Sequence, residues 1–170
     1  MSAIQTNVEA ASASYSSSFT QGHLALPPAK KYLVLTCMDA RIDPARAFGI
    51  DLGDAHVIRN AGASAADALR SIIISQQLLG THEIVLVKHT GCGMLTFGNG
   101  DAYGLVGQNL GQDAVEELRQ KEFDFLPFPE LEKAVVEDVA FLKGSKLVPE
   151  SVAISGWVYE VETGKTRRVV

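Results

Sequence analysis

Residues 31–41, KYLVLTCMDAR, contain the strand that decides the fold. Residues 32–35 are apolar in succession and lead into Cys37, a pattern typical of a strand buried on both faces of a parallel sheet. Asp43 and Pro44 follow as a helix N-cap and a proline at the first helical position, so a short helix is predicted to begin there. A buried strand followed so soon by a helix indicates an α/β fold.

The rest of the chain continues this alternation of strands and helices. We therefore predict a Rossmann-like open sheet of four parallel strands in the order 2-1-3-4, with right-handed crossovers, flanking helices and a C-terminal antiparallel edge strand. The glycine-rich stretch 91–111 is predicted to be looped. The other predicted strands cover 55–60, 83–89, 152–159 and 166–170, and the other predicted helices cover 65–79, 112–120 and 129–141.

Length and composition limit the classes of protein to consider. The chain has 170 residues, enough for one domain, which we place at 31–170, after a Ser- and Ala-rich arm at 1–30 that is either flexible or packed on a partner subunit. A net charge of -5 argues against a nucleic-acid partner, and no apolar run is long enough to span a membrane. With only 2 cysteines, reduced thiols and a cytoplasmic location are expected.

Two motifs place metal ligands at one edge of this sheet. Cys37 ends the first strand and His89 ends the third, while Cys92 follows His89 by three positions. The carboxyl ends of parallel strands meet at one edge, where ligands bind at the point of strand reversal. Two thiolates and one imidazole form a zinc site with an open fourth position. Each cysteine alone could instead be a buried small hydrophobe, and the pair could form a disulfide.

Asp39 and Arg41 stand two residues apart along the predicted extended exit from the first strand, so their side chains can point the same way. A bidentate pair with Arg41 would keep the Asp39 carboxylate oriented and ionised. The carboxylate could then hold a zinc-bound water for attack, or leave Arg41 and fill the fourth zinc position. A surface ion pair without function is the third interpretation.

These residues resemble the β-class carbonic anhydrases, through Cys37-x-Asp39-x-Arg41, through residues 57–62 (VIRNAG) and through His89-x-x-Cys92. The resemblance implies one zinc per subunit on Cys37, His89 and Cys92, with Asp39 and Arg41 as catalytic dyad and Asp39 as fourth ligand in a closed state. It implies that zinc-bound hydroxide converts carbon dioxide, a small-molecule substrate, to bicarbonate and a proton. It also implies a homodimer or homotetramer in which the N-terminal arm embraces the neighbour.

Three alternatives to this activity stay open. The same zinc site could hydrolyse carbonyl sulfide or carbon disulfide, as members of this family with the same core motifs do. Asp39 could close the site permanently and leave a non-catalytic zinc module. Cys37 and Cys92 could also act as a redox dithiol without metal. Lys88 stands where many relatives have a small residue, and we expect it to reshape the sheet edge or an interface.

Overall fold

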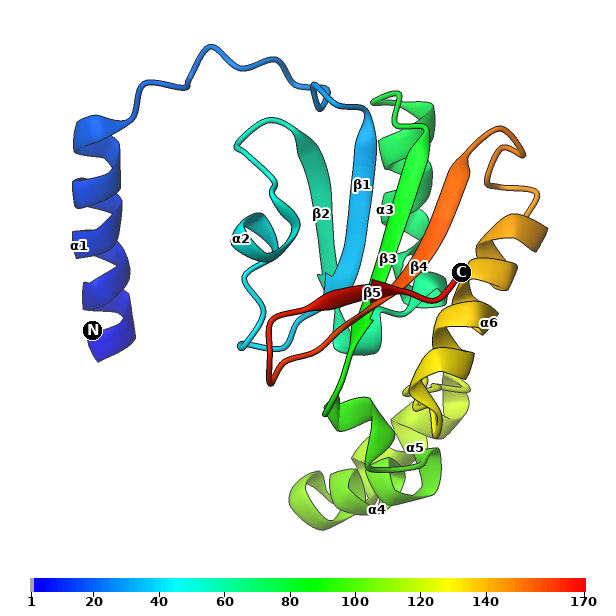
Figure 1. The fold of residues 1–170 in the computed structure, drawn as a ribbon. Helices are drawn as coiled ribbons and strands as arrows, with labels where there is room; N and C mark the ends of the chain where they lie inside the picture. Colours follow the sequence, from blue (N-terminus) through cyan, green and yellow to red (C-terminus); the bar gives the residue numbers. More distant parts are fainter. Residues whose placement is uncertain (1) are drawn as a thin grey trace.

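The computed structural model describes residues 2–170 and contains one five-stranded sheet (Figure 1). The strand order is β2-β1-β3-β4-β5; the first four strands are parallel and β5 is antiparallel to β4. This confirms the predicted α/β class and the 2-1-3-4 order. The strands are β1 (Tyr32–Cys37), β2 (Ala55–Asn60), β3 (Glu83–His89), β4 (Ala153–Tyr159) and β5 (Thr166–Arg168).

Helices cover the two faces of the sheet unequally (Figure 1). The larger core lies between the sheet and the pair α3 and α6, and it includes Leu33, Leu35 and Ile72. A smaller cluster on the other face contains Val34 and, from α2, Phe48. The helices are α1 (Ala3–Ser18), α2 (Pro44–Phe48), α3 (Ala65–Gln77), α4 (Asn99–Leu110), α5 (Gln112–Gln120) and α6 (Leu131–Gly144), with short 3₁₀ turns η1 (Ala61–Ala63) and η2 (Gly93–Leu95).

The prediction of a loop over 91–111 was wrong, because α4 occupies Asn99–Leu110. The carboxylate of Asp101 accepts a hydrogen bond from the Gly98 backbone N–H at 2.8 Å and so caps the first turn. A Cβ atom at Gly107 would lie 3.1 Å from the side chain of Val115 in α5. The glycines that suggested a loop therefore include one that lets two helices pack closely.

Several element boundaries differ slightly from the prediction. Helix α6 begins at Leu131 with Glu130 as N-cap, and it continues to Gly144 instead of ending at residue 141. Strand β5 ends at Arg168, although the Gly156 backbone N–H still donates to the Val170 carbonyl oxygen at 2.9 Å. The two residues after β5 therefore stay hydrogen-bonded to Gly156 of β4.

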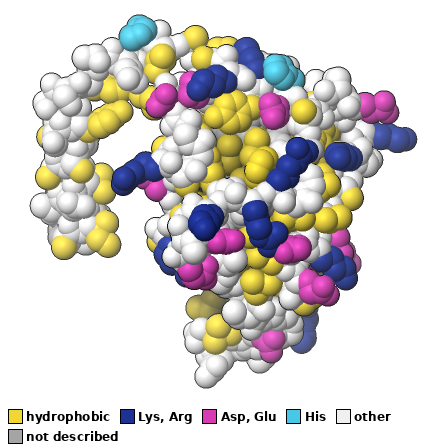
Figure 2. Space-filling view, viewed as in Figure 1, with side chains coloured by type: hydrophobic (Ala, Val, Ile, Leu, Met, Phe, Trp, Pro, Cys, Tyr) yellow, Lys and Arg dark blue, Asp and Glu magenta, His cyan; other side chains and the backbone are white. Residues whose placement is uncertain are grey.

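The N-terminal arm begins with α1, a helix that the sequence analysis did not predict. Ser2 and Gln5 form a capping box at its start, and none of its residues is buried. Figures 1 and 2 show the helix as a limb that stands away from the body of the protein. Packing of this arm on a partner subunit stays a prediction. Within residues 2–170, every helix is too short or too polar to cross a bilayer.

Candidate metal centre

The structure brings together the three residues predicted to hold a metal. Cys37 is the last residue of β1, His89 is the last residue of β3, and Cys92 immediately precedes η2. One ligand atom from each lies within 4.8 Å of the other two, and all three residues are buried. The parallel pairing of β1 with β3 accounts for this convergence, because it aligns the carboxyl ends of the two strands.

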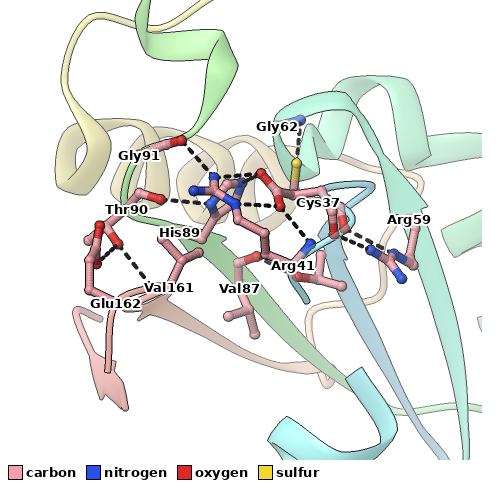
Figure 3. A network of polar contacts seen from close by, with 12 residues as sticks. Cys37, Arg41, Arg59, Gly62, Val87, His89, Thr90, Gly91, Val161 and Glu162 are labelled. Carbon is pink, nitrogen blue, oxygen red and sulfur yellow. Dashed lines mark hydrogen bonds and ion pairs between the residues drawn. The ribbon is translucent and has the colours of Figure 1, made fainter. Parts of the chain in front are cut away.

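The imidazole of His89 is held in its orientation by a backbone contact in its own loop. Its Nδ1 lies 2.8 Å from the Thr90 carbonyl oxygen (Figure 3), and this contact requires a proton on Nδ1. In the neutral ring the lone pair is then on Nε2, a common arrangement in metal-ligating histidines. Nε2 is buried and has no hydrogen-bond partner among residues 2–170. A buried polar atom without a partner is costly, and a metal ion would satisfy it.

The two sulfur atoms also fit a cation. Cys37 and Cys92 are free cysteines, 4% and 2% exposed. The neighbouring Cys92 thiol lowers the pKa of Cys37, against the effect of burial. The proximity of Cys37, together with burial, raises the pKa of Cys92 above its usual range. A dication such as zinc would stabilise both sulfur atoms as thiolates.

Asp39 and Arg41 form the predicted bidentate pair beside this cluster. Arg41 Nε donates to Asp39 Oδ1 at 2.9 Å, and Nη2 donates to Oδ2 at 2.8 Å. These hydrogen bonds hold the pKa of Asp39 well below its usual range. The exit from β1 is a tight turn rather than the predicted extended segment, since the Ile42 N–H donates to the Asp39 carbonyl oxygen at 3.1 Å. Asp39 Oδ2 lies 3.7 Å from His89 Nε2.

Arg59 holds the backbone that carries these side chains, and the sequence analysis assigned it no role. Its Nε donates to the Cys37 carbonyl oxygen at 3.0 Å, and its Nη2 donates to the Asp39 carbonyl oxygen at 2.7 Å (Figure 3). Arg59 lies on β2 opposite Thr36 of β1. The predicted pairing of these two strands places residue 59 near the metal motif, but it does not predict that the side chain reaches the backbone of β1.

Glu162 is a second residue near the site that the sequence analysis left in a turn. The Thr90 hydroxyl donates to Glu162 Oε2 at 2.7 Å and accepts from the Val161 backbone N–H at 3.0 Å. Figure 3 shows this contact beside the His89 ring. The turn that holds Glu162 follows the carboxyl end of β4, which neighbours β3. The strand order thus places it at the same sheet edge as the metal motif.

Lys88 does not lie on an edge strand, so the expectation that it reshapes a sheet edge was wrong, while an effect on an interface stays a prediction. It is 2% exposed, on a strand with neighbours on both sides. Its Nζ lies 2.7 Å from Asp138 Oδ2 and donates to the Gly62 carbonyl oxygen at 2.8 Å. The alternation of side chains along a strand directs Lys88 to the opposite face from His89.

Comparison with known proteins agrees with this site. A family model described as carbonic anhydrase matches residues 32–166. Beta-carbonic anhydrase 1 of Mycobacterium tuberculosis is 39% identical over 168 residues, covering 91% of this chain and 91% of that protein. A carbon disulfide hydrolase of Acidithiobacillus thiooxidans is 35% identical over 158 residues, covering 85% of this chain and 79% of that protein.

Solved structures give the same assignment. A carbonic anhydrase from Glaciozyma antarctica superposes with a TM-score of 0.94 at 44% identity, covering 100% of both chains. A carbonic anhydrase from Streptococcus mutans superposes with a TM-score of 0.89 at 43% identity, covering 100% of this chain and 99% of that one. The chain therefore belongs to the β-carbonic anhydrase family of enzymes.

Proposed function

We propose that this protein is a zinc enzyme that reversibly hydrates carbon dioxide to bicarbonate and a proton. The observation that carries the proposal is the convergence of Cys37, His89 and Cys92 within 4.8 Å, beside the Asp39–Arg41 pair. These ligand atoms would hold one zinc ion and leave a fourth position open. Zinc held there would lower the pKa of a water molecule from 15.7 to about 7 and so supply a nucleophile at neutral pH.

Asp39 has the right place and charge to orient that nucleophile. Its Oδ2 lies 3.7 Å from the unpartnered Nε2 of His89, so a water molecule beside the cluster is within reach of the carboxylate. Because the pKa of Asp39 is well below its usual range, the carboxylate stays ionised and accepts hydrogen bonds without donating any. A water that donates a hydrogen bond to Asp39 presents its lone pair in a fixed direction.

Arg41 keeps Asp39 in this role. Besides its two bonds to the carboxylate, Nη2 donates to the Gly91 carbonyl oxygen at 2.9 Å. The guanidinium therefore ties Asp39 to the loop that carries His89 and Cys92. If Asp39 became a fourth metal ligand, it would have to leave two charge-assisted hydrogen bonds. These two Arg41–Asp39 hydrogen bonds support an open site over a permanently closed, non-catalytic zinc module.

The surroundings of the sulfur atoms suit a small apolar substrate. Ile42, Met94 and Phe128 pack in one cluster with Cys37 and Cys92. Apolar walls with a few convergent polar groups are typical of small-molecule sites. Carbon dioxide has no net charge or dipole, so such a wall can hold it beside Asp39 while excluding bulk water.

Hydrolysis of carbonyl sulfide or carbon disulfide is the second candidate. Relatives named carbon disulfide hydrolase are 34% to 36% identical to this chain. Those substrates are also small, linear and uncharged, and the same polar groups could serve them. A direct comparison separates the two activities: stopped-flow hydration of carbon dioxide and sulfide release from carbonyl sulfide and carbon disulfide, with one zinc-loaded preparation.

We expect hydration of carbon dioxide to dominate and to disappear when zinc is removed. Sulfide release with a larger kcat/KM would overturn the assignment of substrate. Bound zinc without turnover of any of the three substrates would favour the closed module. Dithiol oxidation and reduction by the metal-free protein would favour the redox alternative.

We also propose that the protein is a homodimer or homotetramer in a reducing cytoplasm. Exposed apolar side chains on α1, including Ile4, Val8 and Tyr15, support assembly (Figure 2). The two free cysteines support a reducing compartment, because oxidation would remove the thiolates that the metal needs. Light scattering over a concentration series tests the assembly, and a constant monomer mass would contradict it.

A further inference from the structure

Lys88 is a buried cation whose role the proposed chemistry does not explain. Its side chain is 3% exposed, and it directly precedes His89 on the central strand β3. A buried ammonium group is costly unless its protons are hydrogen-bonded and its charge is paired. The contacts of this group therefore indicate which part of the structure it stabilises.

All the close contacts of Lys88 Nζ lie on the side of the sheet that faces α3 and α6. It donates to the carbonyl oxygens of Gly62 at 2.8 Å and Ala63 at 3.3 Å, and it pairs with Asp138 Oδ2 at 2.7 Å. The Phe128 ring centroid is 4.6 Å away. An ammonium group has three protons, so these three acceptors use its full capacity.

The two carbonyl groups belong to a turn that needs support. Gly62 has φ of 72° and Ala63 has φ of 54°, which is a rarely adopted conformation for a residue other than glycine. A residue keeps such unfavourable backbone angles only where contacts with the surrounding structure hold it there. Lys88 restrains this backbone, because its ammonium group donates hydrogen bonds to two successive carbonyl oxygens of the turn.

The same turn presents a hydrogen-bond donor to a metal-binding sulfur. The Gly62 backbone N–H donates to Cys37 Sγ at 3.4 Å, as Figure 3 shows. This N–H and the two carbonyl groups held by Lys88 lie within two consecutive residues, so the direction of one constrains the others. Hydrogen bonds that a ligand residue receives from neighbouring protein groups commonly change the affinity of a site for its metal.

We propose that Lys88 is a positioning residue that keeps the Gly62 N–H directed at the Cys37 sulfur. The inference rests on the proposed metal site, in which Cys37 is a ligand. Lys88 thereby acts on the site through the backbone of this turn, without itself being a metal ligand. Loss of its ammonium group should weaken metal binding about 10- to 100-fold.

Asp138 has a separate part in this arrangement. Its Oδ2 also accepts from the Ala65 backbone N–H at 3.3 Å, at the first residue of α3. The ion pair thus links α6, α3 and β3. Replacement of Asp138 by Asn keeps a side-chain oxygen for Lys88 and leaves both turn carbonyls available. It should therefore lower stability while the Gly62 contact survives.

The test uses the 15N-labelled, 113Cd-loaded protein and looks for scalar coupling between the Gly62 amide proton and the cadmium nucleus. Such coupling passes through an N–H···S hydrogen bond to a metal-bound sulfur. We expect coupling in the wild type and in Asp138→Asn, and its loss in Lys88→Met. Lys30→Met is the matched control, because Lys30 pairs with Asp54 on the surface.

Coupling that survives in Lys88→Met, with unchanged cadmium affinity, would show that Lys88 has only a structural role. Absence of coupling in the wild type, with cadmium bound to Cys37, would also overturn the inference but leave the proposed function intact. Failure of the protein to bind cadmium at Cys37, His89 and Cys92 would overturn both. If Lys88→Met does not fold, Lys88→Gln, a shorter donor, must show weakened coupling, and undiminished coupling there would contradict the proposal.

Discussion

The Nδ1 atom of His89 lies 2.8 Å from the Thr90 carbonyl oxygen, and the Nε2 atom of the same ring is buried without a hydrogen-bond partner. The first contact determines which ring nitrogen carries the proton, and the second leaves a lone pair facing the two cysteines. Thr90 is in turn anchored by Glu162 through its hydroxyl group. The orientation of the imidazole that we propose as a metal ligand therefore depends on the turn after β4.

This dependence predicts the effect of Thr90→Val. The variant keeps the carbonyl group but loses the hydroxyl bonds to Glu162 and to the Val161 N–H. We expect zinc affinity to fall about tenfold, measured by competition with a chromogenic chelator. Thr163→Val is the control, since the Thr163 hydroxyl bonds only within the exposed turn. Equal zinc affinity in the wild type and Thr90→Val would contradict the anchoring role.

Asp39→Asn should separate metal binding from turnover. The amide keeps the size of the side chain but loses the charge that the Arg41 guanidinium stabilises. We expect the rate of carbon dioxide hydration to fall about 10²- to 10⁴-fold, with zinc content unchanged. Asp54→Asn, at the surface pair with Lys30, is the matched control and should hydrate normally. Turnover near the wild-type rate in Asp39→Asn would remove Asp39 from the mechanism.

The pKa shifts of the thiols predict how zinc affinity changes with pH. The neighbouring Cys92 thiol lowers the pKa of Cys37, which favours the thiolate form of this sulfur. The pKa of Cys92 is raised, so its proton must leave when zinc binds. Zinc affinity should therefore fall as pH falls, by about tenfold per pH unit for each proton released.

Calorimetric titration in buffers of different ionisation enthalpy counts these protons. We expect release of at least one proton per zinc at pH 7. Zinc binding with no proton release would mean that the metal is not held by the Cys92 thiolate.

Gly156→Ala should destabilise the fold while the metal site is retained. A Cβ atom there would lie 2.5 Å from Val135 Cγ1 in α6 and 2.9 Å from Val170 Cγ1. We expect the free energy of unfolding to fall by about 1–3 kcal/mol in urea denaturation. Gly100→Ala is the control, because nothing lies within 4 Å of its Cβ position. Equal stability of the two variants would contradict the close packing of α6 on β4.

The sheet and the metal motif could be predicted because both depend on local patterns. The apolar run at residues 32–35 and the ends of β1 and β3 determine where Cys37 and His89 lie. The order 2-1-3-4 then converts a long separation in sequence into contact, as the register of β1 with β3 confirms. Asp39 and Arg41 follow directly from this placement.

The supporting contacts could not be predicted from local pattern, because they depend on which side chains cross between elements. The Lys88 ammonium group donates a hydrogen bond to the Gly62 carbonyl oxygen, and the Arg59 side chain on β2 donates one to the Cys37 carbonyl oxygen. Helix α4 was missed because the glycines that favour a loop also permit close helix packing, as Gly107 does against Val115. Sequence periodicity carries no information on such contacts.

The most direct test of the central claim is a titration of metal-free protein with zinc while carbon dioxide hydration is followed by stopped flow. The account predicts that the rate rises linearly and reaches its plateau at one zinc per chain. Cys92→Ser, which loses one of the three ligand atoms within 4.8 Å, should require far more zinc and reach little activity. A chain that binds one equivalent of zinc at Cys37, His89 and Cys92 and hydrates no carbon dioxide at any pH would contradict the account.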